Sequence, residues 1–144
     1  MLEVKAYLTA TAVCASLLSA CMTPLPVAER EIDQASLLGN WELTRVDNQP
    51  IANAISLGFQ PDGQVRGAIA CNSFLTDYAV TGTRIEIGDA IITAAGCHPR
   101  FDADPKLKEK AEAVLFAEPP AGLTQDGNFL VMRGDSVLVF ERVD

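Results

Sequence analysis

Basic side chains are scarce in this 144-residue sequence: 11 Lys and Arg stand against 19 Asp and Glu, which gives a net charge of −8. A chain this acidic repels the phosphate backbone of nucleic acids, which excludes nucleic acid as the expected partner. Long apolar runs are also missing beyond residue 22, where no segment approaches the ~18 residues that a membrane-spanning helix needs. Internal repeats and low-complexity tracts are not evident. The sequence therefore predicts an ordinary globular body.

Histidine is the rarest ionisable residue type, since His98 is the single one and stands beside Cys97. This neighbourhood raises two hypotheses, a Cys/His nucleophile and a zinc site. Neighbouring side chains of an extended chain point apart, so Cys97 and His98 make a poor pair. Cys71 with His98 remains possible as a nucleophile pair, but a disulfide would remove the thiol, and a zinc site built from Cys71, Cys97 and His98 has no clear fourth ligand. We interpret His98 as a surface or capping residue.

Other residue types suited to catalysis are present without a partner that the sequence places beside them. Ser73, Thr76 and Asp77 have no histidine or lysine positioned to activate them. We therefore predict no catalytic residues, no metal site and no cofactor, and expect a protein that is not an enzyme. Trp41 and Phe59 are predicted core residues, with exposure at an open barrel mouth as the alternative.

What the chain does have at its start is an apolar segment. Residues 6–20 carry no charged side chain, over about the length of a signal-peptide core. The segment ends in Leu18-Ser19-Ala20-Cys21, which resembles the lipobox of bacterial lipoproteins, where two small residues precede a cysteine that accepts diacylglycerol. The resemblance implies cleavage before Cys21 and attachment to a membrane through lipid on that residue.

The residue after Cys21 bears on the location of such a lipoprotein. Met22, rather than aspartate, resembles cargo sent to the outer membrane. We therefore expect the protein in the cell envelope, on the outer membrane and facing the periplasm. The alternative is an ordinary signal peptide cut near Ala20, with Cys21 left free.

The predicted leader divides the chain into three parts. Removing residues 1–20 leaves 124 residues, the size of one domain with a single core. Residues 21–35 are rich in proline and charge and have little apolar periodicity, which predicts a flexible tether. The folded domain is then expected over residues 36–144.

Apolar residues of this domain recur with a period of two in short segments bounded by turn residues, which predicts β-strands. The predicted strands cover residues 40–46, 55–59, 65–69, 74–80, 84–87, 90–94, 123–126, 129–132 and 137–143. Pro61-Asp62-Gly63 forms a tight turn between the second and third of them. The first half of the domain is therefore expected to be a meander of antiparallel strands.

One segment has the period of a helix instead. Asp104 can cap it, Pro105 fits its first turn, and Pro119-Pro120 follows its end. The apolar face comprises Leu107, Ala111, Val114 and Leu115. A single amphipathic helix needs an apolar surface to cover, and the open side of a strongly curved sheet offers one. The expected fold class is α+β, mostly β, with one helix packed across a curved antiparallel sheet.

Three local patterns in the domain carry a family resemblance. They are Leu38-Gly39-Asn40-Trp41-Glu42-Leu43, Gly67-Ala68-Ile69-Ala70-Cys71-Asn72-Ser73-Phe74 with Tyr78, and Thr93-Ala94-Ala95-Gly96-Cys97. In this order and spacing they resemble the META domain of the heat-shock protein HslJ family over about residues 36–144. The family usually has glycine where this chain has Ala70 and Thr76, and methionine where it has Ala95.

The resemblance implies a cracked, barrel-like sheet with one helix packed across it, similar in shape to lipoprotein pilotins that escort secretin subunits to the outer membrane. No catalytic residues are established for the family. Its members are linked to heat or envelope stress and to tolerance of some antibiotics. The resemblance thus implies a stress-related setting for the protein.

Four cysteines are present, of which Cys14 leaves with the predicted leader and Cys21 is the predicted lipid carrier. Cys71 and Cys97 remain as a pair, which in an exported protein suggests a disulfide. The bond would close a loop of about 25 residues and contribute roughly 3 to 4 kcal/mol. Two buried, unpaired thiols are the alternative.

Three functional hypotheses follow from these observations. The first is a lipid-anchored, non-enzymatic envelope module that binds an envelope protein or a lipid-like ligand between sheet and helix. The second is a pilotin-like chaperone for an outer-membrane assembly. The third is a small thiol-dependent enzyme or hydrolase using residues such as Cys71 and His98. The sequence does not specify an oligomeric state.

Overall fold

The computed structural model describes residues 30–94, 96–98 and 103–144. Two helices and ten strands occur along them, and most of the regular structure is strand. In chain order they are α1 (Gln34–Leu37), β1 (Gly39–Val46), β2 (Gln49–Pro50), β3 (Ile55–Phe59), β4 (Gln64–Ile69), β5 (Asn72–Thr81), β6 (Arg84–Ile87), β7 (Ile91–Ile92), α2 (Pro105–Leu115), β8 (Ala121–Leu123), β9 (Phe129–Arg133) and β10 (Val137–Val143).

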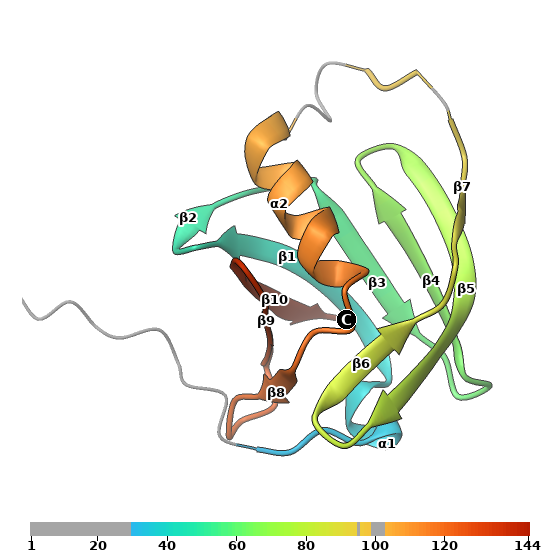
Figure 1. Ribbon diagram of the computed structural model, residues 1–144, viewed down its shortest axis with the longest axis vertical. Helices are drawn as coiled ribbons and strands as arrows, with labels where there is room; N and C mark the ends of the chain where they lie inside the picture. Colours follow the sequence, from blue (N-terminus) through green and yellow to red (C-terminus); the bar gives the residue numbers. More distant parts are fainter. Residues whose placement is uncertain (1–29, 95, 99–102) are drawn as a thin grey trace, which may run out of the picture.

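The strands form one strongly curved antiparallel sheet in the order β6-β5-β4-β3-β1-β10-β9-β8, with β2 beside β1 and β7 beside β5 (Figure 1). The two ends of this order meet, because Arg84 of β6 forms a bridge with Pro120 just before β8. The Ala121 amide donates to the Thr83 carbonyl at 2.7 Å across the same junction. The sheet is thus a nearly closed barrel, as the expected fold class states.

The barrel interior is filled by apolar side chains from its strands. Trp41, Phe59 and Phe140 are among the largest fully buried residues. The Trp41 indole nitrogen donates to the Leu37 carbonyl at 2.8 Å, so its one polar atom is satisfied inside the core. The prediction that Trp41 and Phe59 belong to the core is confirmed, and exposure at a barrel mouth is wrong for both.

Helix α2 lies across one open end of the barrel and packs on β1, β9 and β10 (Figure 1). The Asp104 carboxylate caps it by accepting from the backbone amides of Lys106 at 2.9 Å and Leu107 at 3.2 Å. Its four buried residues are the predicted apolar face, namely Leu107, Ala111, Val114 and Leu115. The helix prediction is confirmed in position, cap and face.

The expected tether and the expected single helix need correction at the start of the domain. Ile32 is buried in the core, and Asp33 and Ser36 form a capping box for the short helix α1. Arg30 pairs with Leu123 of β8 through two backbone hydrogen bonds of 3.2 Å. Residues 30–35 therefore belong to the fold, because one apolar side chain and one cap dock a segment that is otherwise polar. Residues 21–29 lie outside the described residues.

Pro119 and Pro120 follow the helix and also join the barrel through their carbonyl groups. A proline has no amide hydrogen but keeps its carbonyl, and here the Pro119 carbonyl accepts from the Ile85 amide at 3.2 Å. The Pro120 carbonyl accepts from the Arg133 amide at 2.9 Å. The last part of the barrel therefore begins earlier than expected, at residues 119–123 instead of 123–126.

Asp47 connects the helix to the sheet from the turn after β1. Its carboxylate accepts from the Val137 amide at 2.8 Å, the Ser136 hydroxyl at 2.9 Å and the Lys110 ammonium at 3.3 Å. These donors, above all the Val137 amide, hold the pKa of Asp47 below its usual value because they stabilise the carboxylate. The sequence indicated only a turn here.

Candidate functional site

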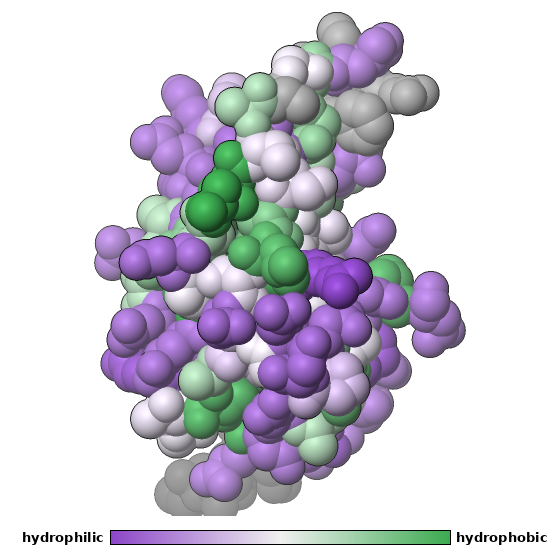
Figure 2. Space-filling view, turned by 90° about the vertical axis from the view of Figure 1, so that its right-hand side faces the viewer, coloured by the Kyte–Doolittle hydropathy of each residue, from purple (hydrophilic) through white to green (hydrophobic). Residues whose placement is uncertain are grey.

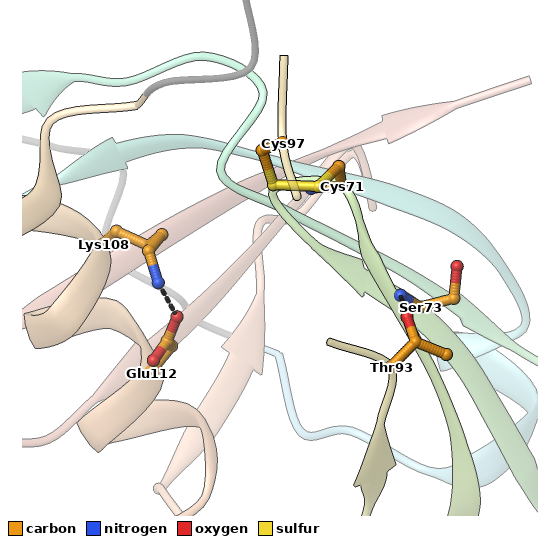
Figure 3. The surroundings of a disulfide bond; sticks show 6 residues. All are labelled: Cys71, Ser73, Thr93, Cys97, Lys108 and Glu112. Carbon is orange, nitrogen blue, oxygen red and sulfur yellow. Dashed lines mark hydrogen bonds and ion pairs between the residues drawn. A yellow bond between two sulfur atoms is a disulfide. The ribbon is translucent and has the colours of Figure 1, made fainter. Parts of the chain in front are cut away.

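A disulfide joins Cys71 and Cys97, whose Cα atoms lie 5.5 Å apart (Figure 3). Cys71 stands in the turn between β4 and β5, and Cys97 follows β7 by five residues. Beside the bond, the Thr93 amide donates to the Ser73 carbonyl and the Ser73 amide to the Thr93 hydroxyl, both at 3.0 Å. The predicted disulfide is confirmed, and the alternative of two unpaired thiols is wrong.

The bond also decides what the two cysteines can do chemically. A sulfur in a disulfide is neither a thiolate nucleophile nor a zinc ligand, so Cys71 and Cys97 serve neither role in this state. His98 is exposed. The Thr76 hydroxyl donates to the Asp89 carbonyl at 3.1 Å, which is a structural contact between β5 and the loop before β7. Within the described ranges, no group of three His, Cys, Asp or Glu side chains converges as a metal site.

Four exposed apolar side chains lie on β5, on β7 and just after α2, and the sequence analysis did not single them out. The exposed fractions are 89% for Ile91, 49% for Leu75, 41% for Ile92 and 37% for Phe116. Leu75 faces Ile91 across the β5–β7 pair, and the Phe116 ring packs edge-on against Phe74 at 6.1 Å between centroids. Figure 2 shows strongly hydrophobic areas near the centre of this side of the molecule, among hydrophilic ones.

The backbone at this place is open as well. β6 pairs with β5 on one side and meets residues 119–121 on the other. β7 pairs with β5, and no second strand pairs with β7 in the described part of the chain. An unpaired strand edge offers amide and carbonyl groups to an added strand. We call Leu75, Ile91, Ile92 and Phe116, with the free side of β7, the open edge.

The sequence profile of the META domain matches residues 34–142, and this range begins with α1 and ends in β10. The chain belongs to the META domain family. The boundary expected from the sequence, residue 36, is thus within two residues of the start of the match. No curated protein matches the sequence.

Two solved structures share the META fold of this chain. An NMR structure of one protein aligns with a TM-score of 0.59 and 16% identity, covering 77% of this chain and 95% of its own. An NMR structure of a protein from Burkholderia xenovorans aligns with a TM-score of 0.57 and 15% identity, covering 97% of this chain and 99% of its own. At such identities the likeness establishes the fold.

The space between the sheet and the helix of this META domain is filled. All four residues of the inner face of α2 are buried, so the binding groove that we expected between sheet and helix is not open. A groove of about 390 Å³ lies instead on the outside, between α2 and the β9–β10 turn. Its lining includes Ala113, Ala117 and Gly134. Internal binding of a lipid-like ligand would thus require the helix to move.

The predicted lipidation site of the META protein remains to be placed against this fold. Leu18, Ser19, Ala20 and Cys21 lie outside the described residues. Within the described residues, no helix has the length and apolarity to cross a bilayer. The tertiary structure thus brings together the disulfide and the open edge, while the anchor remains a prediction from the sequence.

Proposed function

We propose that this protein is a lipid-anchored META-domain module of the cell envelope that binds a protein partner without catalysing a reaction. The open edge is the observation that carries the proposal. An isoleucine with 89% of its surface exposed, on a strand with an unpaired side, is costly for a protein that binds nothing, because such edges promote aggregation.

The sequence and the disulfide support the location. The lipobox-like Leu18-Ser19-Ala20-Cys21 provides an anchor, and Met22 favours the outer membrane. The Cys71–Cys97 bond is typical of oxidising compartments such as the periplasm. The resemblance to the HslJ family favours a role in tolerance of envelope stress.

The occupant that best fits the open edge is an extended apolar segment of an envelope protein. Such a segment would pair with the free side of β7 through its backbone. Every second side chain of the segment could then contact Ile91 and Leu75, which lie across from each other on neighbouring strands. The filled barrel interior disfavours a small ligand held inside the sheet.

Anchoring is tested by the intact mass of the protein extracted from membranes. We expect a chain that begins at Cys21, carries acyl groups there, and is two hydrogens lighter before reduction than after it. Alkylation without reductant should leave Cys71 and Cys97 unmodified, since both sulfurs are bonded. A mature chain without acyl groups would refute the lipoprotein proposal.

Binding is tested with a photoreactive side chain at position 91. We expect cross-links to one short apolar segment of an envelope protein, and loss of its capture by Ile91→Asp without loss of fold, because position 91 is exposed. The matched control is Ala113→Asp on the outer face of α2, an exposed apolar position outside the open edge. Cross-links scattered over many proteins, or equal capture by both variants, would contradict the proposal.

The same edge favours a pilotin-like chaperone as the second candidate. A lipid anchor combined with strand addition is suited to escorting an outer-membrane subunit. Cross-linking separates the two candidates, since a chaperone would contact its client during assembly and the client would fail to reach the outer membrane in a strain that lacks this protein.

A further inference from the structure

A second surface lies where the barrel closes, between Thr83 in the β5–β6 turn and strand β8. Residues 120–122 form the floor of a hollow of about 200 Å³ with Thr83, and Arg30, Glu31 and Arg133 complete its lining. Both arginines are exposed. We call this surface the seam hollow.

Backbone hydrogen bonds fix the two arginines of the seam hollow relative to each other. Arg30 is bonded in both directions to Leu123, and the Arg133 amide donates to the Pro120 carbonyl. A third arginine, Arg84, bridges to Pro120 and donates to the Glu118 carbonyl at 2.7 Å. Three arginine residues are thus attached to one short stretch of chain, residues 118–123, two of them through the backbone and Arg84 also through its guanidinium.

Arg30 and Arg133 form no salt bridge among the described residues, and the Arg30 guanidinium lies near Gly127. The ion pairs found there join Lys108 to Glu112 and Lys110 to Asp47, both at the helix. Glu31 lies in the lining as the one acidic member of the seam hollow. Arg30 and Arg133 place two guanidinium groups at the seam, and the planar fork of each is suited to donate a pair of hydrogen bonds to the oxygens of a phosphate group.

The path of the chain indicates which phosphate the seam hollow meets. The described chain begins at Arg30 beside β8 (Figure 1), nine residues after Cys21. Nine residues span at most about 30 Å, so a bilayer that holds Cys21 lies within that reach of the seam hollow. The net charge of −8 makes an anionic surface repel the rest of the protein, which favours approach through its basic part.

We propose that the seam hollow binds the phosphates of anionic phospholipids in the membrane that carries the anchor. This inference rests on the proposed acylation of Cys21. Docking in this way holds the barrel seam on the bilayer, while the open edge, on strands at another part of the barrel, stays accessible to a partner.

The test uses the mature protein extracted from membranes, with vesicles of phosphatidylcholine alone or with one third phosphatidylglycerol. Flotation with phosphatidylcholine vesicles measures the anchor, and amide hydrogen exchange measures docking. In vesicles with phosphatidylglycerol we expect exchange at Arg30, Ala121, Leu123 and Arg133 to slow roughly 25-fold, since each of the two arginines near an anionic surface contributes about a fivefold change in docking. The double variant Arg30→Gln/Arg133→Gln should abolish this difference in amide exchange between the two vesicle types.

The control variant is Arg45→Gln/Arg66→Gln, which removes the same charge from exposed positions on β1 and β4. It should leave the difference in amide exchange between the two vesicle types unchanged. Flotation with equal exchange in both vesicle types overturns the inference and leaves the anchor standing. Flotation on phosphatidylglycerol vesicles alone, lost in the Arg30/Arg133 variant, supports the seam hollow and refutes the anchor. Flotation on neither vesicle overturns both.

Discussion

Val114→Asp is expected to unfold the domain. Val114 is 3% exposed, and its methyl groups lie close to Gly134, where an added Cβ would approach them to 3.1 Å. The substitution loses about 1.5 to 3 kcal/mol of apolar burial and places a carboxylate in the core, at a further cost of several kcal/mol. The sum is comparable with the total stability of an ordinary domain, roughly 5 to 15 kcal/mol.

Circular dichroism and urea unfolding of purified protein measure this effect. The control is Ala113→Asp, one position earlier in the same helix but exposed, and it should change the free energy of unfolding by less than about 0.5 kcal/mol. If Val114→Asp folds with near-native stability, α2 is not a fixed part of the core. A movable helix would then reopen the space between sheet and helix as a binding groove.

Loss of the disulfide has the second largest expected effect. Cys71 and Cys97 are 26 residues apart, and on the loop-entropy model a bond at this separation stabilises the folded state by about 3.5 kcal/mol. Cys71→Ser/Cys97→Ser should lower the free energy of unfolding by about this amount. It should also speed amide exchange at Thr93, because the segment after β7 is then held on β5 by the hydrogen bonds between Ser73 and Thr93 without the disulfide.

The control for this variant is the unmodified protein treated with a dithiol reductant, which should show the same loss. A change below about 1 kcal/mol in both samples would mean that the bond does not constrain the unfolded chain as this model assumes. Because the bond ties down the segment that carries β7, capture of a partner at Ile91 should weaken together with stability.

Much of the fold was predictable from local patterns. The alternation in β1 and the helical spacing of Leu107, Ala111 and Val114 arise from the geometry of single elements, which a sequence displays directly. Boundaries were less predictable where an element depends on its neighbours. The predicted strand over residues 90–94 shortens to Ile91–Ile92, because β7 has pairing partners on one side only in the described chain.

Ala70 shows how local chemistry and topology combine. Its φ of +54° lies in the left-handed region, where glycine, the usual residue of the family at this place, has no steric penalty. The chain accepts alanine there because the turn is held on both sides, by the Ala70 amide donating to the Ala54 carbonyl at 2.7 Å and by the disulfide at the next residue.

The candidate sites were less accessible from sequence than the fold. The pairing of Cys71 with Cys97 was predictable by counting cysteines, but the open edge was not. An Ile-Ile pair in a strand pattern indicates burial of at least one side chain, whereas Ile91 and Ile92 are both exposed. Arg30 and Arg133 are 103 positions apart, and nothing in their local sequence indicates a common hollow.

By itself, the sequence determined the β-rich class, the long amphipathic helix and its buried face, the cysteine pair and the family. Each depends on residue type and spacing along the chain. The tertiary structure alone decided that Pro119 and Pro120 close the barrel, that residues 30–35 join the fold, and that the open edge and the seam hollow exist. Those features require contacts between segments distant in sequence, whose register is set by the packing of the whole barrel.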